Sequence, residues 1–219
     1  STLLASSAAS DVYKRQACKL YGSKLVFFDN TYMYPKDSEP QTENTPFIPV
    51  GRKSIVRAKM AEMVLSEIHN RELDAVICRA PEFYGPDKTQ SITNTMFLDK
   101  IKEDKTASIP INSSCQRSLI WTPDASRAMV LIANTPSAYN QTWHLPCDKP
   151  HSYKELRQIA EKILNKKVKA RVIREWQFNL IKSFNKSMQE LNELLPRYRQ
   201  DNLFISCLLY TSPSPRDRG

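Results

Sequence analysis

The amino-acid sequence predicts an α/β protein built on a parallel sheet. Two short apolar runs, Leu25–Phe28 and Ala75–Cys78, each lead into a cluster of polar and aromatic residues. Continuous apolar runs bounded by turn residues are typical of parallel strands covered on both faces. Apolar residues at helical spacing predict a helix over Lys53–Asn70, between the two runs. A strand, helix and strand in this order predict a right-handed crossover in a parallel sheet.

Both polar clusters follow the carboxyl end of a predicted strand. They comprise Asp29–Tyr34 and Arg79–Pro86. Ligands of open α/β sheets bind just beyond these strand ends, so the two clusters predict one crevice. The loop Pro35–Val50 is longer than most connections, and we expect it to cover that site.

The remaining elements are predicted from local patterns. Their order is the end of a helix at Ala17–Tyr21 closed by Gly22, a helix over Thr93–Glu103, strands at Ala107–Pro110 and Ser118–Ile120, a helix over Ala125–Ala133 capped by Asp124, a strand at Gln141–Leu145, a helix over Tyr153–Leu164 opened by Ser152 or His151, a β pattern at Val168–Ile173, and helices at Trp176–Phe184 and Ser187–Leu195.

Composition excludes several classes of protein. No apolar run approaches the roughly 18 residues of a membrane span, so we expect no membrane association. The five cysteines form no close pairs, which argues against zinc ribbons and redox dithiols and favours a reducing, cytoplasmic setting. The three histidines have no spaced partners, and no metal site is expected.

The positive charge is concentrated near the C-terminus. Residues 17–148 carry 15 Lys/Arg and 15 Asp/Glu, whereas residues 149–205 carry 13 Lys/Arg and 6 Asp/Glu. Such a basic segment either binds phosphate, RNA or an acidic membrane surface or is a solvated helical face. It lacks the interleaved aromatic residues of a single-strand binding face, so we expect no nucleic-acid partner.

Three blocks carry a family resemblance. They are Thr31-Tyr32-Met33-Tyr34-Pro35, then Arg79-Ala80-Pro81-Glu82-Phe83-Tyr84-Gly85-Pro86, and finally Arg117-Ser118-Leu119-Ile120-Trp121-Thr122-Pro123-Asp124-Ala125-Ser126-Arg127-Ala128. In order and spacing they resemble the later part of the extended short-chain dehydrogenase/reductase family, the NAD(P)-dependent sugar-nucleotide epimerases and dehydratases. The resemblance implies the C-terminal part of a Rossmann-like parallel sheet with a smaller, mostly helical substrate lobe. It further implies an NAD or NADP cofactor and a small-molecule substrate such as a sugar nucleotide, and it is compatible with a homodimer of the full-length protein.

The glycine-rich loop of that family is missing. Only four glycines occur, and no two lie close together, whereas a dinucleotide fold needs three within about six residues. We therefore expect a truncated protein without the first half of the nucleotide-binding sheet. The expected organisation is an adaptor-like or disordered tail over 1–16, a partial NAD(P)-binding domain over 17–148, a basic lobe over 149–205 and a second such tail over 206–219.

The catalytic Tyr-x-x-x-Lys of the family lies on a helix. Tyr32–Lys36 and Tyr84–Lys88 have this spacing, but Pro35 and Gly85-Pro86 are incompatible with a helix, so neither is the motif. Lys53 and Arg57 occupy its two positions by analogy. Arginine stays protonated and cannot act as a base, and lysine can do so only if its pKa is depressed. We interpret the pair either as solvated helix residues or as a site for the cofactor ribose or phosphate.

Other candidates come from the strand ends. Asn30 or Thr31 stands near the family's catalytic Ser/Thr, and Tyr34, in preference to Tyr32, is predicted to replace the missing phenol. The resemblance also implies cofactor contacts from Asp29, Ala80 and Pro81 and substrate contacts from Glu82, Tyr84 and Arg117. Arg117 would hold phosphate through a bidentate fork, unless it forms a surface salt bridge.

The functional prediction is hydride transfer by an epimerase, dehydratase or reductase acting on a sugar nucleotide or a similar hydroxylated metabolite. The alternative is a non-catalytic NAD(P)-binding regulator, in which the lost Tyr-x-x-x-Lys leaves binding without turnover.

Overall fold

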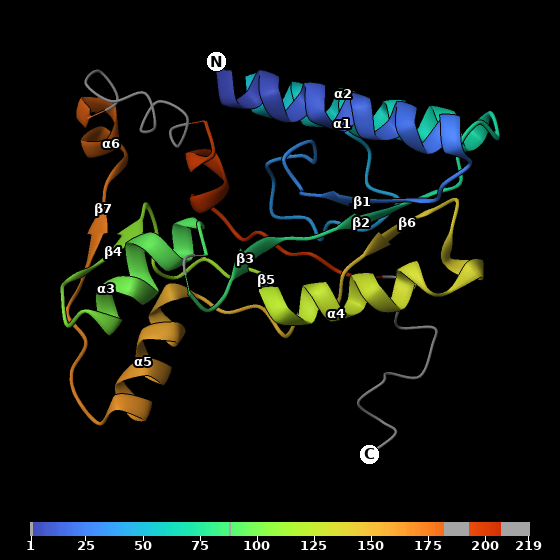
Figure 1. The fold of residues 1–219 in the computed structure, drawn as a ribbon. Coiled ribbons are helices and arrows are strands. Elements are labelled where there is room, and N and C mark those ends of the chain that lie inside the picture. The colour runs from blue at the N-terminus through green and yellow to red at the C-terminus, as the bar shows by residue number, and fades with distance from the viewer. Residues whose placement is uncertain (1, 88, 182–192, 207–219) are drawn as a thin grey trace.

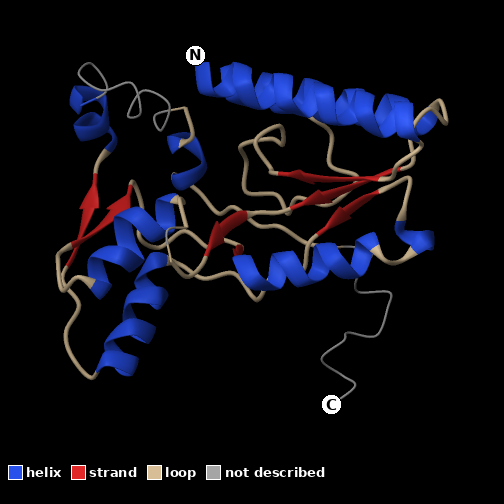
Figure 2. Ribbon diagram, in the orientation of Figure 1, coloured by secondary structure: helices blue, strands red, loops and turns tan. Residues whose placement is uncertain are grey.

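A three-stranded parallel sheet forms the centre of the protein, as predicted (Figures 1 and 2). The computed structural model describes residues 2–87, 89–181 and 193–206, without the side chains of 2–11 and 181. The strand order is β1-β2-β6, from β1 (Leu25–Asp29), β2 (Ala75–Arg79) and β6 (Thr142–His144). All five residues of β2 are buried, because β2 has a strand on each side and helices on both faces.

Helices cover the two faces of this sheet. On one face α1 (Thr2–Tyr21) and α2 (Arg52–His69) pack on Phe27, Ala75 and Ile77. On the other face α4 (Thr122–Ala133) packs on Val76 and Cys78. The alternation of side chains along β1 and β2 thus supplies two apolar layers, as a doubly covered strand requires.

A smaller lobe follows the sheet. It contains two further parallel pairs, β3 (Glu82–Tyr84) with β5 (Leu119–Trp121) and β4 (Ala107–Pro110) with β7 (Ala170–Ile173). Helix α5 (Tyr153–Leu164) begins with a capping box, in which Ser152 Oγ accepts from Glu155 N and the Glu155 carboxylate accepts from Ser152 N. The lobe also holds the π-helix η1 (Thr93–Leu98), α3 (Asp99–Lys102), the 3-10 helix η3 (Leu195–Tyr198) and α6 (Glu175–Ile181). The 3-10 helix η2 (Pro136–Ala138) follows α4 and packs against the main sheet through Ala138.

Three local predictions need correction. The helix that ends at Tyr21 extends back to Thr2, through the segment expected to be a tail, and Arg15 pairs with Glu67 of α2 at 2.9 Å. Asp124 lies in the first turn of α4 and does not cap it, since that helix starts at Thr122. The helix expected over Thr93–Glu103 begins as a π-helix. The helix predicted at Ser187–Leu195 falls largely outside the described residues.

Residues 193–206, here called the return segment, bring the C-terminal part of the chain back to the sheet (Figure 1). Gln41 N donates to Leu203 O, and Ile205 N donates to Gln41 O, both at 2.9 Å. Ser118 N donates to Asn202 O at 3.0 Å. The return segment is therefore held between the long loop after β1 and the start of β5. No helix of the described residues is long and apolar enough to cross a membrane.

Candidate functional site

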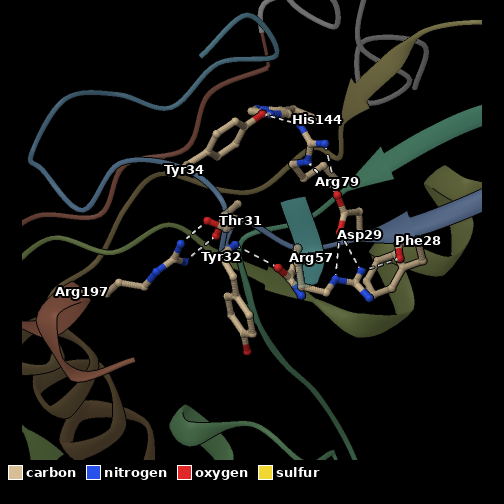
Figure 3. A network of polar contacts seen from close by, with 10 residues as sticks. Phe28, Asp29, Thr31, Tyr32, Tyr34, Arg57, Arg79, His144 and Arg197 are labelled. Carbon is tan, nitrogen blue, oxygen red and sulfur yellow. Dashed lines mark hydrogen bonds and ion pairs between the residues drawn. The ribbon is translucent and has the colours of Figure 1, made fainter. Parts of the chain in front are cut away.

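Asp29, the last residue of β1, joins three elements at the strand ends (Figure 3). Its Oδ1 accepts from Arg57 Nη2 of α2 at 2.6 Å, and its Oδ2 accepts from Arg79 Nε of β2 at 3.1 Å. Asp29 is fully buried, and Arg79 is 1% exposed. A buried carboxylate needs such partners, because an unpaired charge in the interior is strongly destabilising.

Arg79 continues this network to Tyr34 and His144. Arg79 Nη1 donates to Tyr34 Oη at 2.6 Å, and Tyr34 Oη lies 2.7 Å from His144 Nε2. His144 Nδ1 lies 2.8 Å from the carbonyl oxygen of Ile205. A carbonyl can only accept, so Nδ1 carries the ring proton and Nε2 accepts the proton of Tyr34. We call Asp29, Tyr34, Arg57, Arg79 and His144 the closed network.

The closed network is sealed from solvent except at Arg57, which is partly exposed. Tyr34 and His144 are both 0% exposed, and the His144 ring stacks on Phe204 of the return segment at 3.9 Å. Burial lowers the pKa of His144 to about 4, against a smaller opposing effect of Glu43. Burial also raises the pKa of Tyr34, although Arg79 acts in the other direction. Both groups are therefore neutral near pH 7.

A second group of side chains leaves the same turn on its other side. Arg197 of the return segment donates from Nη1 to Thr31 Oγ1 at 2.8 Å and from Nη2 to the Thr31 carbonyl. Its guanidinium also lies 5.2 Å from the centre of the Tyr32 ring. Figure 3 shows the Tyr32 ring pointing away from Tyr34. We call Thr31, Tyr32 and Arg197 the open cluster.

Both carboxylate oxygens of Glu82 accept hydrogen bonds from other groups of the protein. Its Oε1 accepts from Thr93 N at 3.0 Å and from Thr93 Oγ1 at 2.7 Å. Its Oε2 accepts from Arg117 Nη2 and from Tyr198 Oη, both at 2.9 Å. The other tip of Arg117, Nη1, donates to Arg197 O at 2.8 Å. A phosphate fork from Arg117 therefore requires the Glu82 pair to open.

The start of α2 is occupied by a carboxylate of the return segment. Glu193 Oε1 accepts from Lys53 N at 2.6 Å, where a helix leaves unpaired backbone donors. Gly51, with φ +96°, precedes the helix, and a Cβ there would lie 2.5 Å from Glu193 Oε1. Lys36 Nζ donates to Val50 O at 2.9 Å beside it. This helix N-terminus therefore already holds an anion supplied by the protein itself.

The structure gathers the predicted site residues at one strand-end region, but it uses most of them internally. Asn30 Oδ1 accepts from Tyr32 N at 2.9 Å, a local turn. Arg57 binds Asp29 and the Phe28 carbonyl. Buried positions are taken by Asp29, Thr31, Tyr34, Ala80, Pro81 and Arg117, whereas Asn30, Lys53, Arg57, Glu82 and Tyr84 keep partial exposure. The burial of Tyr34 gives no support to its predicted role as the catalytic phenol.

Sequence reasoning missed Arg197, Glu193 and His144 as parts of the strand-end region. Arg197 lies 166 positions from Thr31, and Glu193 lies 140 positions from Lys53, so no local spacing relates them. The sequence offers no spaced metal-ligand partner for His144, and its hydrogen-bond partner in the structure is Tyr34, 110 positions away. The available signal was the short run Arg197-Tyr198-Arg199 in the return segment, which places two cations beside an aromatic ring.

The described residues do not fit the pyrophosphate of a dinucleotide. That group needs closely spaced glycines whose backbone approaches it at a helix N-terminus. Of the glycines that the structure describes, Gly51 is the one at a helix start, and Glu193 fills the space there. The strand-end groups are polar and partly exposed, which suits the other, nicotinamide end of such a cofactor. Among the described residues no cluster is arranged to hold a metal ion.

Comparison with known proteins gives a family match. The model of the NAD dependent epimerase/dehydratase family matches residues 10–145. A curated relative, the uncharacterized protein y4nL of Sinorhizobium fredii, is 27% identical over 166 residues, which are 73% of this chain and 43% of that protein.

Solved structures share the fold at low sequence identity. UDP-glucuronic acid 4-epimerase from Bacillus cereus, in complex with NAD, has a TM-score of 0.66 at 19% identity, covering 73% of this chain and 53% of that one. UDP-N-acetylglucosamine 4-epimerase from Methanobrevibacter ruminantium has 0.65 at 20%, covering 87% and 67%. dTDP-4-dehydrorhamnose reductase from Bacillus anthracis, in complex with NADP, has 0.64 at 18%, covering 90% and 62%. The chain spans about half the length of the first two relatives described, y4nL and the B. cereus epimerase.

Proposed function

Since the chain belongs to the NAD dependent epimerase/dehydratase family, we propose that it forms the substrate-facing part of an NAD(P)-dependent enzyme acting on a sugar nucleotide. The bound cofactor supplies or accepts hydride in this chemistry. The observation that carries the proposal is the position of Asn30 and Tyr32 directly after the carboxyl end of β1, which pairs in parallel with β2, because α/β sheets bind ligands at such strand ends. The likeness to a UDP-sugar epimerase and a dTDP-sugar reductase supports this substrate class.

The chain's own groups would hold and orient the sugar part of the substrate. Glu82 and Arg117 lie on the side of the smaller lobe and form an ion pair with each other. A ligand that binds either side chain has to compete with this pair. Lys53 and Asn30 retain partial exposure on the sheet side and can reach hydroxyl groups. The Lys53 ammonium would bind the ground state and the transition state alike. It would therefore contribute to substrate affinity and not to the rate of the chemical step.

A non-catalytic, NAD(P)-binding regulator is the second candidate. The observation that favours it is the complete burial of Tyr34 together with lysine at the family's tyrosine position. In that case cofactor binding would persist without turnover.

The test compares the 219-residue chain with a longer product of the same reading frame that carries a glycine-rich loop. Each is incubated with NAD or NADP and with UDP-glucose, UDP-glucuronate or a dTDP-4-keto sugar, and products are separated by chromatography. We expect turnover by the longer protein and none by the chain alone. Cofactor binding without turnover on any of these substrates favours the regulator, and the absence of both rejects the proposal.

A further inference from the structure

The hydroxyl group of Tyr32 makes no hydrogen bond to any described residue. The other tyrosines around the strand ends are committed: Tyr34 to Arg79 and His144, Tyr153 to Thr93, and Tyr198 to Glu82. The Tyr32 side chain is partly exposed, so its hydroxyl can meet a ligand that approaches from solvent. Tyr84 also lacks such a bond, but it lies near the carboxylates of Asp124 and Asp148.

The charges around Tyr32 differ from those around Tyr84. Burial raises the pKa of Tyr32, and the negative charge of Glu82 adds to that rise, while the positive charges of Arg197 and, more weakly, Arg57 act against it. Burial also raises the pKa of Tyr84, and there both neighbouring carboxylates add to the rise. Tyr32 is thus protonated near pH 7, and Arg197 is the charge that most favours loss of its proton.

The backbone that carries Tyr32 is held from two sides. Its own N–H donates to Asn30 Oδ1 at 2.9 Å. The preceding residue, Thr31, accepts hydrogen bonds from both terminal nitrogens of Arg197. The same Arg197 guanidinium lies 5.2 Å from the Tyr32 ring. One arginine therefore fixes the position of the turn and supplies positive charge to the phenol. A catalytic group must be fixed in this way to act within hydrogen-bond reach of a substrate.

We propose that Tyr32 is the proton donor for a carbonyl substrate and that Arg197 stabilises the phenolate left behind, an inference that rests on the proposed function. The reaction is reduction of a keto sugar by a reduced nicotinamide dinucleotide. The carbonyl carbon gains a hydride with its electron pair, the C=O π bond becomes a C–O single bond, and the oxygen takes the Tyr32 proton. Solvent then returns a proton to the phenolate. Tyr32 would thus take the proton-donating role of the family's tyrosine, whose position is occupied by Lys53 in this chain.

Ionisation of Tyr32 is measured first, because it does not depend on turnover. The 219-residue chain is labelled with ¹³C at tyrosine Cζ, and its titration is followed by NMR, with Tyr32→Phe assigning the signal. Arg197→Gln should move the Tyr32 titration to higher pH, whereas Arg197→Lys, which keeps the charge, should move it less. Near-ultraviolet circular dichroism checks that each variant is folded. An unchanged Tyr32 titration in folded Arg197→Gln would overturn the role of Arg197.

Catalysis is measured next in the longer protein, as NADPH oxidation with a dTDP-4-keto sugar. Tyr32→Phe should lower kcat by about 10²–10⁴-fold with little change in KM, the range expected for loss of a general acid. Tyr21→Phe, on the exposed end of α1, is the matched control and should leave kcat unchanged. Undiminished kcat in Tyr32→Phe would overturn the proposal. No reduction by the wild-type protein would reject the proposed function and the donor role with it, while the NMR result would still decide whether Arg197 acts on Tyr32.

Discussion

The closed network and the open cluster leave one turn of the chain in opposite directions. Tyr34 and Tyr32 are two positions apart, yet Tyr34 is fully buried with both hydroxyl interactions used, whereas the Tyr32 hydroxyl is free of described partners. Each side places one tyrosine beside at least one arginine. The difference is that His144 accepts the hydroxyl proton of Tyr34, whereas no described residue accepts that of Tyr32. The first arrangement stabilises the fold, and the second is suited to a ligand.

The largest expected effect is removal of Arg79 from the closed network. Arg79→Leu leaves Asp29 buried with Arg57 as its remaining cation and leaves Tyr34 without its donor. Breaking a buried ion pair from one side typically costs about 3–5 kcal/mol of unfolding free energy. Urea unfolding of the wild type and the variant measures the loss. Arg127→Leu, in an exposed pair with Asp124, should change little, and an equally small effect of Arg79→Leu would refute the closed network as a stabilising unit.

The pH dependence of stability should report on His144. Its pKa is about 4 in the folded protein and about 6.5 when unfolded, so the unfolded state binds the proton more readily. Stability contributed by the neutral ring is therefore complete above about pH 6.5 and is lost as the pH falls towards 4, by roughly 3 kcal/mol in total. The positive charge of Arg79 disfavours the protonated ring, and Glu43 favours it.

Urea unfolding at several pH values between 4 and 7 tests this prediction. His144→Asn should flatten the stability curve in that window, because the titrating group is gone. His69→Asn, at the exposed end of α2, should keep the slope of the wild type. Equal slopes in wild type and His144→Asn would show that the ring is protonated or exposed in the folded protein.

The two tyrosines should respond differently to loss of their hydroxyl groups. Tyr34→Phe leaves Arg79 Nη1 and His144 Nε2 without their shared partner, which costs about 1–3 kcal/mol for buried groups. Tyr32→Phe removes no hydrogen bond to a described residue and should stay within about 0.5 kcal/mol of the wild type. Thermal unfolding of the two variants side by side gives the comparison. A larger loss in Tyr32→Phe than in Tyr34→Phe would reverse our assignment of the open and closed sides.

Local sequence patterns predicted the scaffold but not the partners within it. The apolar runs of β1 and β2 are local signals, and the structure confirms both strands, although Phe28 of β1 is exposed. Of the two residues predicted to open α5, Ser152 is the N-cap. The strand-end location of the polar groups followed from the general topology of parallel sheets. Which tyrosine is buried did not, because Tyr34 is sealed by Phe204 and His144, which lie far along the chain.

The smallest effect concerns the N-terminus of α2, where Glu193 compensates for the absence of a capping side chain at Gly51. Glu193→Ala removes an acceptor from Lys53 N and a negative charge from the positive end of the helix. A lost N-cap interaction typically costs about 1 kcal/mol. Glu175→Ala, which removes a carboxylate from an exposed pair with Arg199, is the matched control and should cost less. Urea unfolding measures both variants.

Loss of Glu193 also opens the helix N-terminus to an external anion, so inorganic phosphate should stabilise Glu193→Ala more than the wild type. Equal stabilisation of the two proteins by phosphate would mean that Glu193 does not occupy an anion site.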